Sequence, residues 1–495
     1  MRDWEPRRLA QAAGAQLVVE PARVSSGMPT GPRGASVDSR ELRPGELFVG
    51  LRGEREDGGG YAAKALSAGA WGVLVTPEHA RVLAAAANAG EVTNAGAGAV
   101  LAHEDPLGAL HALARAWRRE LGGRGARVVA ITGSTGKTST KDILAALLGA
   151  RTRVAASPAN RNTEIGLPLA LLGAPKDVEV VVLEMAMRGA GQIAQLTAIA
   201  EPDVGVIVNV GPAHLQLLGS LEAIAAAKAE LIAGLQSGVS VVVPAGEPLL
   251  ARHLRDDVNT ITFGEGGDVR LVERRADGSV LIVAGGEEIE LWPSFAQAHN
   301  LLNLLAAVAA ARALGYTPSG RVEVEFSAMR GQREALAGGA LLIDDCYNAN
   351  PMSMRAAIDD LAETARARRV AVLGDMLELG PDAERLHREI GRHAGASGIE
   401  LLVAVGPLAA EMSATFAGEI HCVPDAPAAA ETVPGLLRTG DTVLVKGSRG
   451  VGLERVVAAL GAGGAGEGTT GEGHPGEPSC GEHPVVSAAA APGRR

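Results

Sequence analysis

The segment "ITGSTGKTST", residues 131–140, carries the residue types that bind phosphate. A strand-like run precedes it and a helical stretch follows, so backbone N–H groups at the helix start would face an anion. Only two residues separate its first glycine from the Gly-Lys pair, whereas the common phosphate-binding loop has four. A plain glycine-rich turn is the alternative, but Gly-Lys-Thr in this position favours a nucleoside triphosphate. The candidate residues are Gly133, Ser134, Thr135, Gly136, Lys137, Thr138 and Ser139.

Two further polar residues follow strand-like runs. Glu184 closes "VVVLE", and His214 follows "VIVNVGPA". The carboxyl ends of parallel strands form the ligand-binding edge of an open α/β sheet, so both side chains could approach a metal-bound nucleotide. Histidine is an unusual magnesium ligand, and a structural hydrogen bond is the alternative for His214. Lys228, in "AIAAAKAELIAG", by position alone fits a solvated or snorkelling side chain.

The elements around these residues predict α/β architecture. Near-continuous Val/Ile runs at 178–184, 204–210 and 239–244 alternate with helical stretches, which is typical of a parallel sheet buried on both faces. We predict a small N-terminal α/β domain, a central P-loop ATPase-like sheet, a C-terminal Rossmann-like domain, and a disordered tail rich in Gly and Pro. The predicted boundaries are 1–108, 109–325, 326–460 and 461–495.

Composition narrows the function. The chain has 495 residues, 47% of them hydrophobic and only 2% aromatic, with a formal net charge of −11. Few rings and an acidic balance argue against a nucleic-acid partner. Neither a signal-peptide pattern nor 18 uninterrupted apolar residues occur, which predicts a cytoplasmic protein without membrane insertion. Three widely spaced cysteines, Cys346, Cys422 and Cys480, predict reduced thiols rather than disulfides or zinc.

Several motifs in order along the chain resemble the Mur ligases of bacterial cell-wall synthesis. The resemblance runs through all three predicted domains and leaves only the tail uncovered. The shorter phosphate loop is the form that this family uses. The motifs are "DSRELRPGELFVGLRG", "GSTGKTSTK", "NRNTEIGLPLALL", "LEMAMRGAGQIAQL", "NVGPAHLQLLGSLEAIAAAKAEL", "DDCYNANPMSM", "VLGDMLELG" and "VKGSRG".

The resemblance implies an ATP-dependent amide ligase that works as a monomer. In this family ATP phosphorylates the terminal carboxylate of a nucleotide-linked peptide, and an amine then attacks the acyl phosphate. The strings "YNANP" and "GDMLELG" favour the member that joins D-alanyl-D-alanine to UDP-N-acetylmuramoyl-tripeptide. The sister that adds a diamino acid carries Asp-Asn-Pro-Arg, which this sequence lacks. A related ligase is the first alternative, and a nucleotide-binding module or kinase is the second.

The resemblance also implies roles for the catalytic residues. Lys137 would contact the transferred phosphate, Thr138 and Glu184 would hold one Mg²⁺, and His214 would help hold a second. Lys228 aligns with a lysine that becomes a carbamate by reaction with carbon dioxide. A carbamate would turn a repulsive ammonium into an anionic group beside two cations and a triphosphate.

Substrate positions follow from the same resemblance. Asn300 and Asn303, beside His299, would contact adenosine, and Arg333 and Asp345 would contribute nucleotide contacts as the third domain closes. The remaining candidates are Ser39 and Arg40 for the uridine diphosphate end, Asn160, Asn162 and Thr163 for the muramoyl peptide, and Tyr347, Asn348 and Asn350 for the dipeptide. A helix-capping or loop-bracing role is the alternative for Asn300, and a plain Asn-Pro turn is the alternative for "YNANP".

The sequence departs from the family pattern at three places. Where relatives have Asp-Gly-His in the N-terminal domain, this chain has "EDGGGY", which leaves the uridine contacts open. The glycine usual before the His-Asn pair is replaced in "QAHN". Cys346 stands where serine is usual, a near-isosteric change that predicts a small buried side chain.

Overall fold

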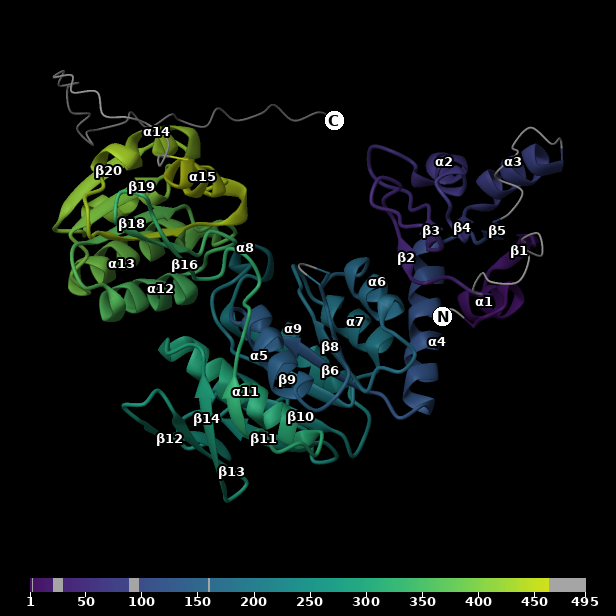
Figure 1. The fold of residues 1–495 in the computed structure, drawn as a ribbon, viewed down its shortest axis with the longest axis horizontal. Coiled ribbons are helices and arrows are strands. Elements are labelled where there is room, and N and C mark those ends of the chain that lie inside the picture. Colours follow the sequence, from purple (N-terminus) through teal and green to yellow (C-terminus); the bar gives the residue numbers. More distant parts are fainter. Residues whose placement is uncertain (2, 21–29, 89–97, 159–160, 463–495) are drawn as a thin grey trace, which may run out of the picture. The chain divides into compact units, whose positions relative to one another are not determined.

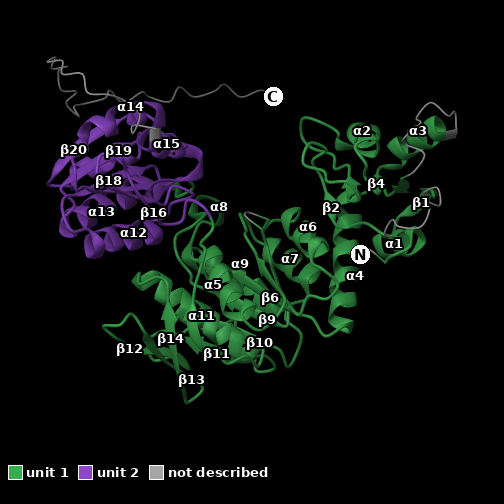
Figure 2. Ribbon diagram, viewed as in Figure 1, with its two compact units in different colours: residues 1–327, 378–380 green, residues 328–377, 381–495 purple. Residues whose placement is uncertain are grey.

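The computed structural model describes residues 1, 3–20, 30–88, 98–158 and 161–462, which form three β-sheets with helices on their faces (Figure 1). The chain divides into two compact units (Figure 2). Unit 1 contains residues 1–327 and 378–380, and unit 2 contains residues 328–377 and the chain from 381 onward. The predicted α/β class is confirmed. Helix α15, Glu454–Ala462, includes the first two residues of the stretch predicted as a tail, and the rest of that stretch lies outside the described residues.

The first sheet of unit 1 has five strands in the order β1-β5-β4-β3-β2. All neighbours in it are parallel except β1 and β5. The strands are β1 Gln16–Val19, β2 Ala35–Ser36, β3 Leu47–Val49, β4 Gly72–Val75 and β5 Ala99–Ala102. The helices are α1 Pro6–Ala13, the 3₁₀ turn η1 Gly58–Tyr61, α2 Ala62–Ser67 and α3 Pro77–Asn88.

The second sheet of unit 1 has ten strands in the order β15-β14-β13-β12-β11-β10-β9-β6-β8-β7. The run from β7 to β12 is parallel, and an antiparallel hairpin set, β12 to β14, extends it. The strands are β6 Arg127–Thr132, β7 Val154–Ala156, β8 Val180–Glu184, β9 Val204–Ile207, β10 Ser240–Pro244, β11 Asn259–Phe263, β12 Val269–Arg274, β13 Val280–Ala284, β14 Glu287–Pro293 and β15 Gly320–Val322.

Helices cover both faces of this sheet. Alternate residues of β6 point to opposite cores: Val128 and Ala130 pack with one layer, whereas Val129 and Ile131 pack with the other. The first layer comprises α4 Pro106–Gly123, α6 Gly166–Gly173, α7 Gln192–Ala200 and α9 Leu221–Gly234. The second comprises α5 Lys137–Gly149 and α11 Ala298–Ala313; the short helices α8 Leu215–Leu218 and α10 Pro248–Ala251 complete the unit.

Burial on both faces explains why the Val/Ile runs lack alternation. The runs predicted at 178–184, 204–210 and 239–244 are confirmed as β8, β9 and β10, each somewhat shorter than predicted. The three lie in the parallel part of the sheet, whose carboxyl edge carries the phosphate loop.

Unit 2 contains a six-stranded sheet in the order β16-β17-β21-β18-β19-β20. All its pairs are parallel except β16 with β17. The strands are β16 Gln332–Ala335, β17 Leu341–Asp344, β18 Arg369–Gly374, β19 Leu401–Val405, β20 Glu419–Val423 and β21 Thr442–Lys446. The helices are α12 Pro351–Thr364, α13 Ala383–Ala396, α14 Ala426–Leu436 and α15, with 3₁₀ turns η4 Ala409–Ala414 and η5 Arg449–Val451. A further 3₁₀ turn, η3 Gly380–Asp382, begins at the last residue of the segment 378–380, which belongs to unit 1.

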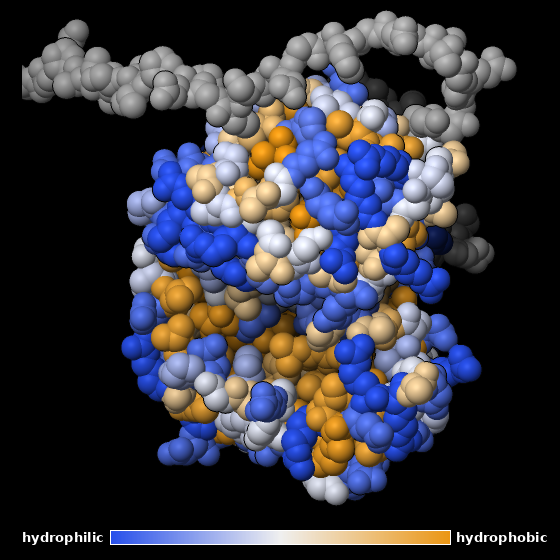
Figure 3. All heavy atoms as spheres, turned by 90° about the vertical axis from the view of Figure 1, so that its left-hand side faces the viewer, coloured by the Kyte–Doolittle hydropathy of each residue, from blue (hydrophilic) through white to orange (hydrophobic). Residues whose placement is uncertain are grey.

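The surface mixes hydrophilic and apolar residues on the face drawn in Figure 3. Large apolar side chains that are exposed include Val82, Leu217, Val272 and Leu302, which lie on different elements. None of the described helices combines the length and the apolar composition that crossing a bilayer requires.

Candidate active site

The phosphate loop connects β6 to α5, as the sequence predicts. Gly136 is the residue before α5 and has φ +76°, in the left-handed region that favours glycine. A Cβ at this position would also lie 2.5 Å from Asn303 Oδ1. The close approach of α11 to the loop, together with the backbone angle, therefore requires glycine here. The first N–H groups of α5 have no partners within the helix, which leaves them suited to phosphate oxygens.

Asn209, which lies beyond the end of β9, forms hydrogen bonds with the start of this loop. Its Oδ1 accepts hydrogen bonds from the backbone N–H groups of Ser134 and Thr135, each at 3.0 Å, and its Nδ2 donates to Thr135 O at 3.1 Å. Ser134 Oγ also donates to Gly211 O at 2.8 Å. The backbone N–H groups of Ser134 and Thr135, which were predicted to face an anion, thus donate to Asn209 instead. These bonds fix the conformation of the loop.

Thr138, Glu184 and Asn162 lie together. Thr138 Oγ1 donates to Glu184 Oε2 at 2.8 Å, and Asn162 Nδ2 donates to Glu184 Oε1 at 2.8 Å. Glu184 is only 2% exposed and Thr138 3%. The tertiary structure thus brings one predicted peptide-binding residue against the predicted metal ligands. Thr163 lies nearby in the chain and is exposed, whereas Asn160 falls outside the described residues.

Three cationic or titratable groups lie close enough to influence one another. Burial lowers the pKa of Lys228 well below its usual value, and the charge of Lys137 lowers it further. Burial also lowers the pKa of His214, with smaller contributions from Lys137 and Lys228, against an opposing hydrogen bond with Glu378. Lys137 Nζ donates to Gly133 O at 2.8 Å. Both shifts favour the neutral forms of Lys228 and His214, so Lys137 is the group of the three that carries the positive charge for an anionic ligand.

Lys228 is not the surface residue that its position suggests. It is 2% exposed on α9, and no described residue forms a hydrogen bond or ion pair with its amine. A buried amine without a counter-ion favours the neutral form. A neutral amine is also the form that reacts with carbon dioxide.

The donor set fits magnesium in part. Thr138 and Glu184 offer a hydroxyl and a carboxylate, the hard oxygen donors that Mg²⁺ prefers. His214 points its Nδ1 at Glu378 rather than at these two residues. Among the described residues no group of three or more His, Cys, Asp or Glu converges. The arrangement therefore suits an ion that takes its remaining ligands from phosphates and water.

Asn300 and Asn303 lie on the first turns of α11 and are 6% and 4% exposed. Asn303 Nδ2 donates to Asn300 Oδ1 at 3.2 Å, and Asn303 Oδ1 lies against the phosphate loop. Gln297 precedes the helix, and no side-chain capping bond forms there. The structure therefore shows no helix cap at Asn300, whereas the loop-bracing alternative agrees with its hydrogen bond to Asn303, which lies against the phosphate loop.

A cavity of about 790 Å³ lies at the carboxyl edge of the first sheet. Ser39 and Arg40, predicted to bind the uridine diphosphate end, line it together with Arg52, Lys64 and Tyr61. Arg40 forms an ion pair with Asp38 at 2.6 Å, and its hydrogen bonds lower the pKa of Asp38 to about 2. The cavity thus offers cations for phosphates and a ring for a base.

The departure at "EDGGGY" has a structural counterpart. A Cβ added to Gly59 would lie 2.2 Å from Cδ2 of His79, so the imidazole from α3 fills the space where a side chain at 59 would project. His79 Nε2 lies 3.0 Å from Asp57 Oδ2, while Asp57 Oδ1 accepts from Gly59 N at 2.9 Å. The η1 turn, whose Gly58 and Tyr61 line the cavity, is thereby fastened to α3.

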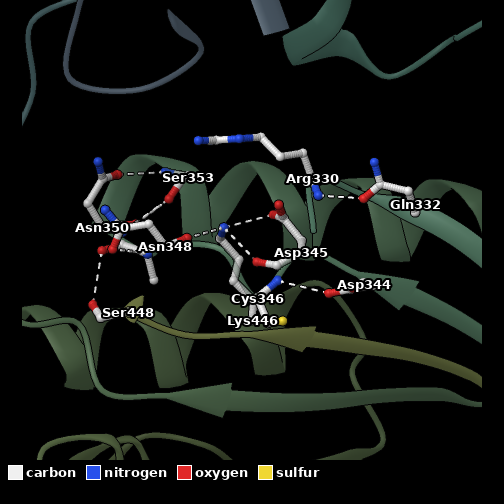
Figure 4. A network of polar contacts seen from close by, with 11 residues as sticks. Arg330, Gln332, Asp344, Asp345, Cys346, Asn348, Asn350, Ser353, Lys446 and Ser448 are labelled. Carbon is white, nitrogen blue, oxygen red and sulfur yellow. Dashed lines mark hydrogen bonds and ion pairs between the residues drawn. The ribbon is translucent and has the colours of Figure 1, made fainter. Parts of the chain in front are cut away.

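The remaining candidates lie in unit 2. Arg333 donates from Nη2 to both carboxylate oxygens of Asp360 at 2.8 Å. Asp345 accepts from Lys446, and the Tyr347 ring lies under the Arg330 guanidinium at 4.2 Å. Figure 4 shows the polar contacts of the loop between β17 and α12, which include the ion pair of Asp345 with Lys446.

Two asparagines of this loop have local roles. Asn350 caps α12, because its side chain accepts from Ser353 N at 2.9 Å while Ser353 Oγ accepts from Asn350 N. Asn348 Oδ1 accepts from Ala349 N at 2.9 Å. Both side chains therefore bond to the backbone of their own loop, which agrees with the alternative that "YNANP" is a plain turn. Cys346 is 1% exposed, as expected for a small buried residue, and burial raises the pKa of its thiol.

Sequence reasoning missed Asn209 and Lys446. Both lie inside motifs quoted above, "NVGPAHL" and "VKGSRG", and both lie at or just beyond the carboxyl ends of strands. Strand-end position was the available signal, since it had already selected Glu184. The partners of both residues lie far away in the sequence, so their contacts could not be read from spacing.

Similarity to known proteins agrees with this geometry. Residues 131–311 match the Mur ligase middle domain, and residues 320–449 match the Mur ligase, glutamate ligase domain. The chain is 36% identical to the UDP-N-acetylmuramoyl-tripeptide--D-alanyl-D-alanine ligase of Bacillus subtilis (strain 168), over 86% of this chain and 93% of that protein. It is 35% identical to the ligase of the same name from Mycobacterium leprae (strain TN), over 94% of this chain and 99% of that protein.

Solved structures give the same result. MurF from Acinetobacter baumannii aligns with a TM-score of 0.78 at 28% identity, over 93% of this chain and 99% of that one. MurF from Thermotoga maritima in complex with ADP aligns with a TM-score of 0.73 at 31% identity, over 87% of this chain and 97% of that one. The phosphate loop, the strand-end carboxylate and these similarities together establish that the chain belongs to the Mur ligase family.

Proposed function

We propose that the protein is an ATP-dependent ligase that joins D-alanyl-D-alanine to UDP-N-acetylmuramoyl-tripeptide, giving the pentapeptide precursor of peptidoglycan. The observation that carries this proposal is the β6–α5 phosphate loop, with Thr138, Asn162 and Glu184 hydrogen-bonded beside it. Relatives that carry this ligase name match along most of the chain.

The chemistry proceeds in two steps. The terminal carboxylate of the tripeptide attacks the γ-phosphorus of ATP, so that an acyl phosphate forms and ADP leaves. The amino group of D-alanyl-D-alanine then attacks the acyl carbon, phosphate departs, and the amine loses a proton as the amide forms. Phosphorylation is needed because a free carboxylate resists nucleophiles, and the protein contributes mainly alignment and charge neutralisation.

The residues divide this work. Lys137 stays near the transferred phosphate and offsets its charge, and the first turn of α5 holds the phosphate chain. Asn209 and Asn303 keep the loop in its binding shape from two sides. Mg²⁺, held by Thr138 and Glu184 with a second ion near His214, would neutralise the phosphate oxygens when bound.

Lys228 is the residue on which carbamate formation would occur. Its burial and its lowered pKa support the neutral amine that carbon dioxide requires. A carbamate there would place a negative charge among Lys137, His214 and the bound cations, where the buried amine by itself has no counter-ion. Loss of phosphate release when bicarbonate and carbon dioxide are removed, with recovery on adding bicarbonate, is the expected behaviour.

Each part of the chain has a proposed task. Residues 1–108 bind the uridine diphosphate end through Ser39 and Arg40, residues 109–325 bind ATP and the muramoyl peptide, and residues 326–460 present the dipeptide. We place the enzyme in the cytoplasm as a monomer that supports cell-wall synthesis, and through it cell shape and division.

Phosphate release from ATP tests the function directly. Purified protein with Mg²⁺, UDP-N-acetylmuramoyl-tripeptide and D-alanyl-D-alanine is expected to release phosphate and yield the pentapeptide by mass spectrometry. Omitting any one component, or replacing Lys137 by Ala, is expected to reduce release by at least about a hundredfold, because an aligned charge on the transferred phosphate is lost. Lys176→Ala, at an exposed lysine of the same unit, is the matched control.

The outcome separates the alternatives. Release that needs the nucleotide-linked peptide but accepts another amine, and not the dipeptide, would show a sister ligase. Release that depends on neither substrate would contradict the proposal and favour a nucleotide-binding module.

A further inference from the structure

A short segment of unit 1, residues 161–165, connects the cavity near Ser39 to Glu184. Ile165 lines the cavity, and among the described residues that line it only Ile165 lies beyond residue 107. Three residues earlier, Asn162 Nδ2 donates to Glu184 Oε1 at 2.8 Å. Three residues of chain span at most about 11 Å. The wall of the cavity and the strand-end carboxylate therefore lie at the two ends of one short stretch of chain.

This segment follows a tightly closed path. Asn162 O accepts from Ala186 N at 2.9 Å, just beyond the end of β8, and Thr163 Oγ1 accepts from Gly166 N at 3.3 Å. A Cβ added to Gly166 would lie 2.6 Å from Arg161 Cα. Any side chain at position 166 would therefore displace the backbone of the segment.

The carbonyl of Glu164 lacks the donor that a helix would normally supply. At the start of α6 a carbonyl accepts from the N–H four residues later, as Ile165 O does from Leu169 N at 3.4 Å. The residue four positions after Glu164 is Pro168, which has no N–H. His111 supplies the missing donor, since its Nε2 lies 2.7 Å from Glu164 O. A carbonyl oxygen only accepts, so Nε2 carries the proton.

Helix α4 brings His111 to this carbonyl, because α4 packs against α6 (Figure 1). The first residues of α4, Pro106 and Leu107, line the same cavity as Ile165. His111 lies one turn further along the helix and is half-buried. One helix thus forms part of the cavity wall and also holds the segment that leads from the cavity to Glu184.

We propose that His111 is a positioning residue, which holds residues 161–165 in place as the surface along which the peptide part of the substrate lies. The inference rests on the proposed function, because it takes a UDP-linked muramoyl peptide as the ligand. Such a molecule, with its nucleotide in the cavity and its terminal carboxylate at the phosphate loop, has to lie along the stretch that connects these places. His111 itself does not contact the substrate. Without its imidazole, Glu164 O loses its donor and the segment is free to shift.

Binding of two ligands tests this role. Calorimetric titration of the full chain with UDP and with UDP-N-acetylmuramoyl-tripeptide gives a ratio of dissociation constants that isolates the muramoyl-peptide part. We expect the wild type to bind the tripeptide nucleotide at least about tenfold more tightly than UDP, since the added part makes contacts of its own. His111→Leu removes the donor and is expected to lower this ratio at least about fivefold. Its affinity for UDP should stay within about twofold of the wild type, because the cavity residues are unchanged.

Three further variants complete the design. His111→Gln keeps an N–H donor for Glu164 O and is expected to keep the wild-type ratio. Gly166→Ala displaces the same segment from another side and is expected to lower the ratio, which keeps the proposal falsifiable if His111→Leu does not fold. Arg115→Leu, at an exposed residue one turn further along α4, is the matched control and should keep the ratio. A purely structural role would lower stability and affinity for both ligands without moving the ratio.

Four results would overturn the inference: a wild type that binds both ligands equally, a folded His111→Leu or Gly166→Ala that keeps the full ratio, or a His111→Gln that loses as much as the Leu variant. ATP and D-alanyl-D-alanine are absent from these titrations. A failure of the proposed dipeptide ligation would therefore leave the ratio intact and be distinguishable from a failure of this inference.

Discussion

At the scale of single residues, the site depends on close contacts that allow little substitution. Gly136 is enclosed by Asn303, and Gly59 is enclosed by the His79 ring. In both cases a polar side chain from a distant segment uses the space that a Cβ would occupy. The sequence shows these positions only as glycines, whereas the structure shows which partner each glycine admits.

Gly59→Ala is the sharpest residue-scale prediction. The new Cβ would lie 2.2 Å from His79 Cδ2, so the ring must move and its contact with Asp57 must break. Overpacking of this kind costs about 1–3 kcal/mol of stability. Because η1 lines the cavity assigned to the uridine diphosphate end, affinity for UDP is expected to fall as well. Thermal unfolding and calorimetric titration with UDP measure both effects.

Gly60→Ala provides the matched control. Nothing lies within 4 Å of a Cβ built on Gly60, so stability should change by no more than about 0.5 kcal/mol and UDP affinity should be unchanged. Equal behaviour of the two variants would show that His79 does not occupy the space beside Gly59.

At the scale of elements, unit 2 uses a buried histidine to join a helix to the loop after a strand. His387 on α13 is fully buried; its Nδ1 lies 2.7 Å from Ala383 O and its Nε2 lies 2.9 Å from Met376 N. Ala383 O can only accept, so Nδ1 must carry a proton, and the Met376 N–H can only donate, so Nε2 must be unprotonated. The His387 ring is therefore neutral, with its proton on Nδ1. Protonation of Nε2 would break the bond to the loop after β18.

This geometry predicts acid sensitivity. Burial lowers the pKa of His387 below its ordinary value of 6.5, although Ala383 O, Asp375 and Glu411 oppose the shift. Between the two pKa values the unfolded chain binds a proton that the folded chain does not, so stability falls as pH falls below about 6.5. We expect unfolding at pH 7.5 and 5.5 to show this loss in the wild type.

Two substitutions isolate the histidine. His387→Gln can keep both hydrogen bonds and cannot titrate, so its stability should depend less on pH across that range. His387→Leu should cost about 1–3 kcal/mol even at pH 7.5, because the Met376 N–H would be buried without a partner. An unchanged pH slope in the Gln variant would argue against His387 as the source.

At the scale of the whole molecule, two compact units share one chain. Unit 1 contains the phosphate loop, the Thr138–Glu184 contact and the cavity near Ser39, while unit 2 contains the Asp345–Lys446 pair. Chains of this kind need not unfold in a single two-state step.

We expect calorimetry to resolve two unfolding transitions. All residues that line the cavity near Ser39 belong to unit 1, so UDP should raise only the transition of that unit. At a ligand concentration of a hundred times Kd, the stabilisation is about 2.7 kcal/mol. His387→Leu should lower the other transition and so identify it. One transition that shifts as a whole with UDP would show that the two units unfold together.

The sequence by itself determined the elements and the chemistry of their ends. Valine-rich runs predicted the parallel strands, Gly-Lys-Thr predicted the nucleotide loop, and the polar ends of strands selected Glu184, because these features depend on neighbours within a few residues. The predicted segments were longer than the strands that form: Val178 and Val208 are buried but lie outside β8 and β9, because the extent of a strand depends on backbone pairing with its neighbours and not on composition.

Only the tertiary structure decided which distant residues meet. Asn209 lies 74 residues from Thr135 in the chain, and Lys446 lies 101 residues from Asp345. His79 fills the space beside Gly59, and Lys228 becomes a buried amine on a helix that reads as partly exposed. Periodicity and spacing describe each segment separately, whereas these contacts exist only because packing of the sheets brings the segments together.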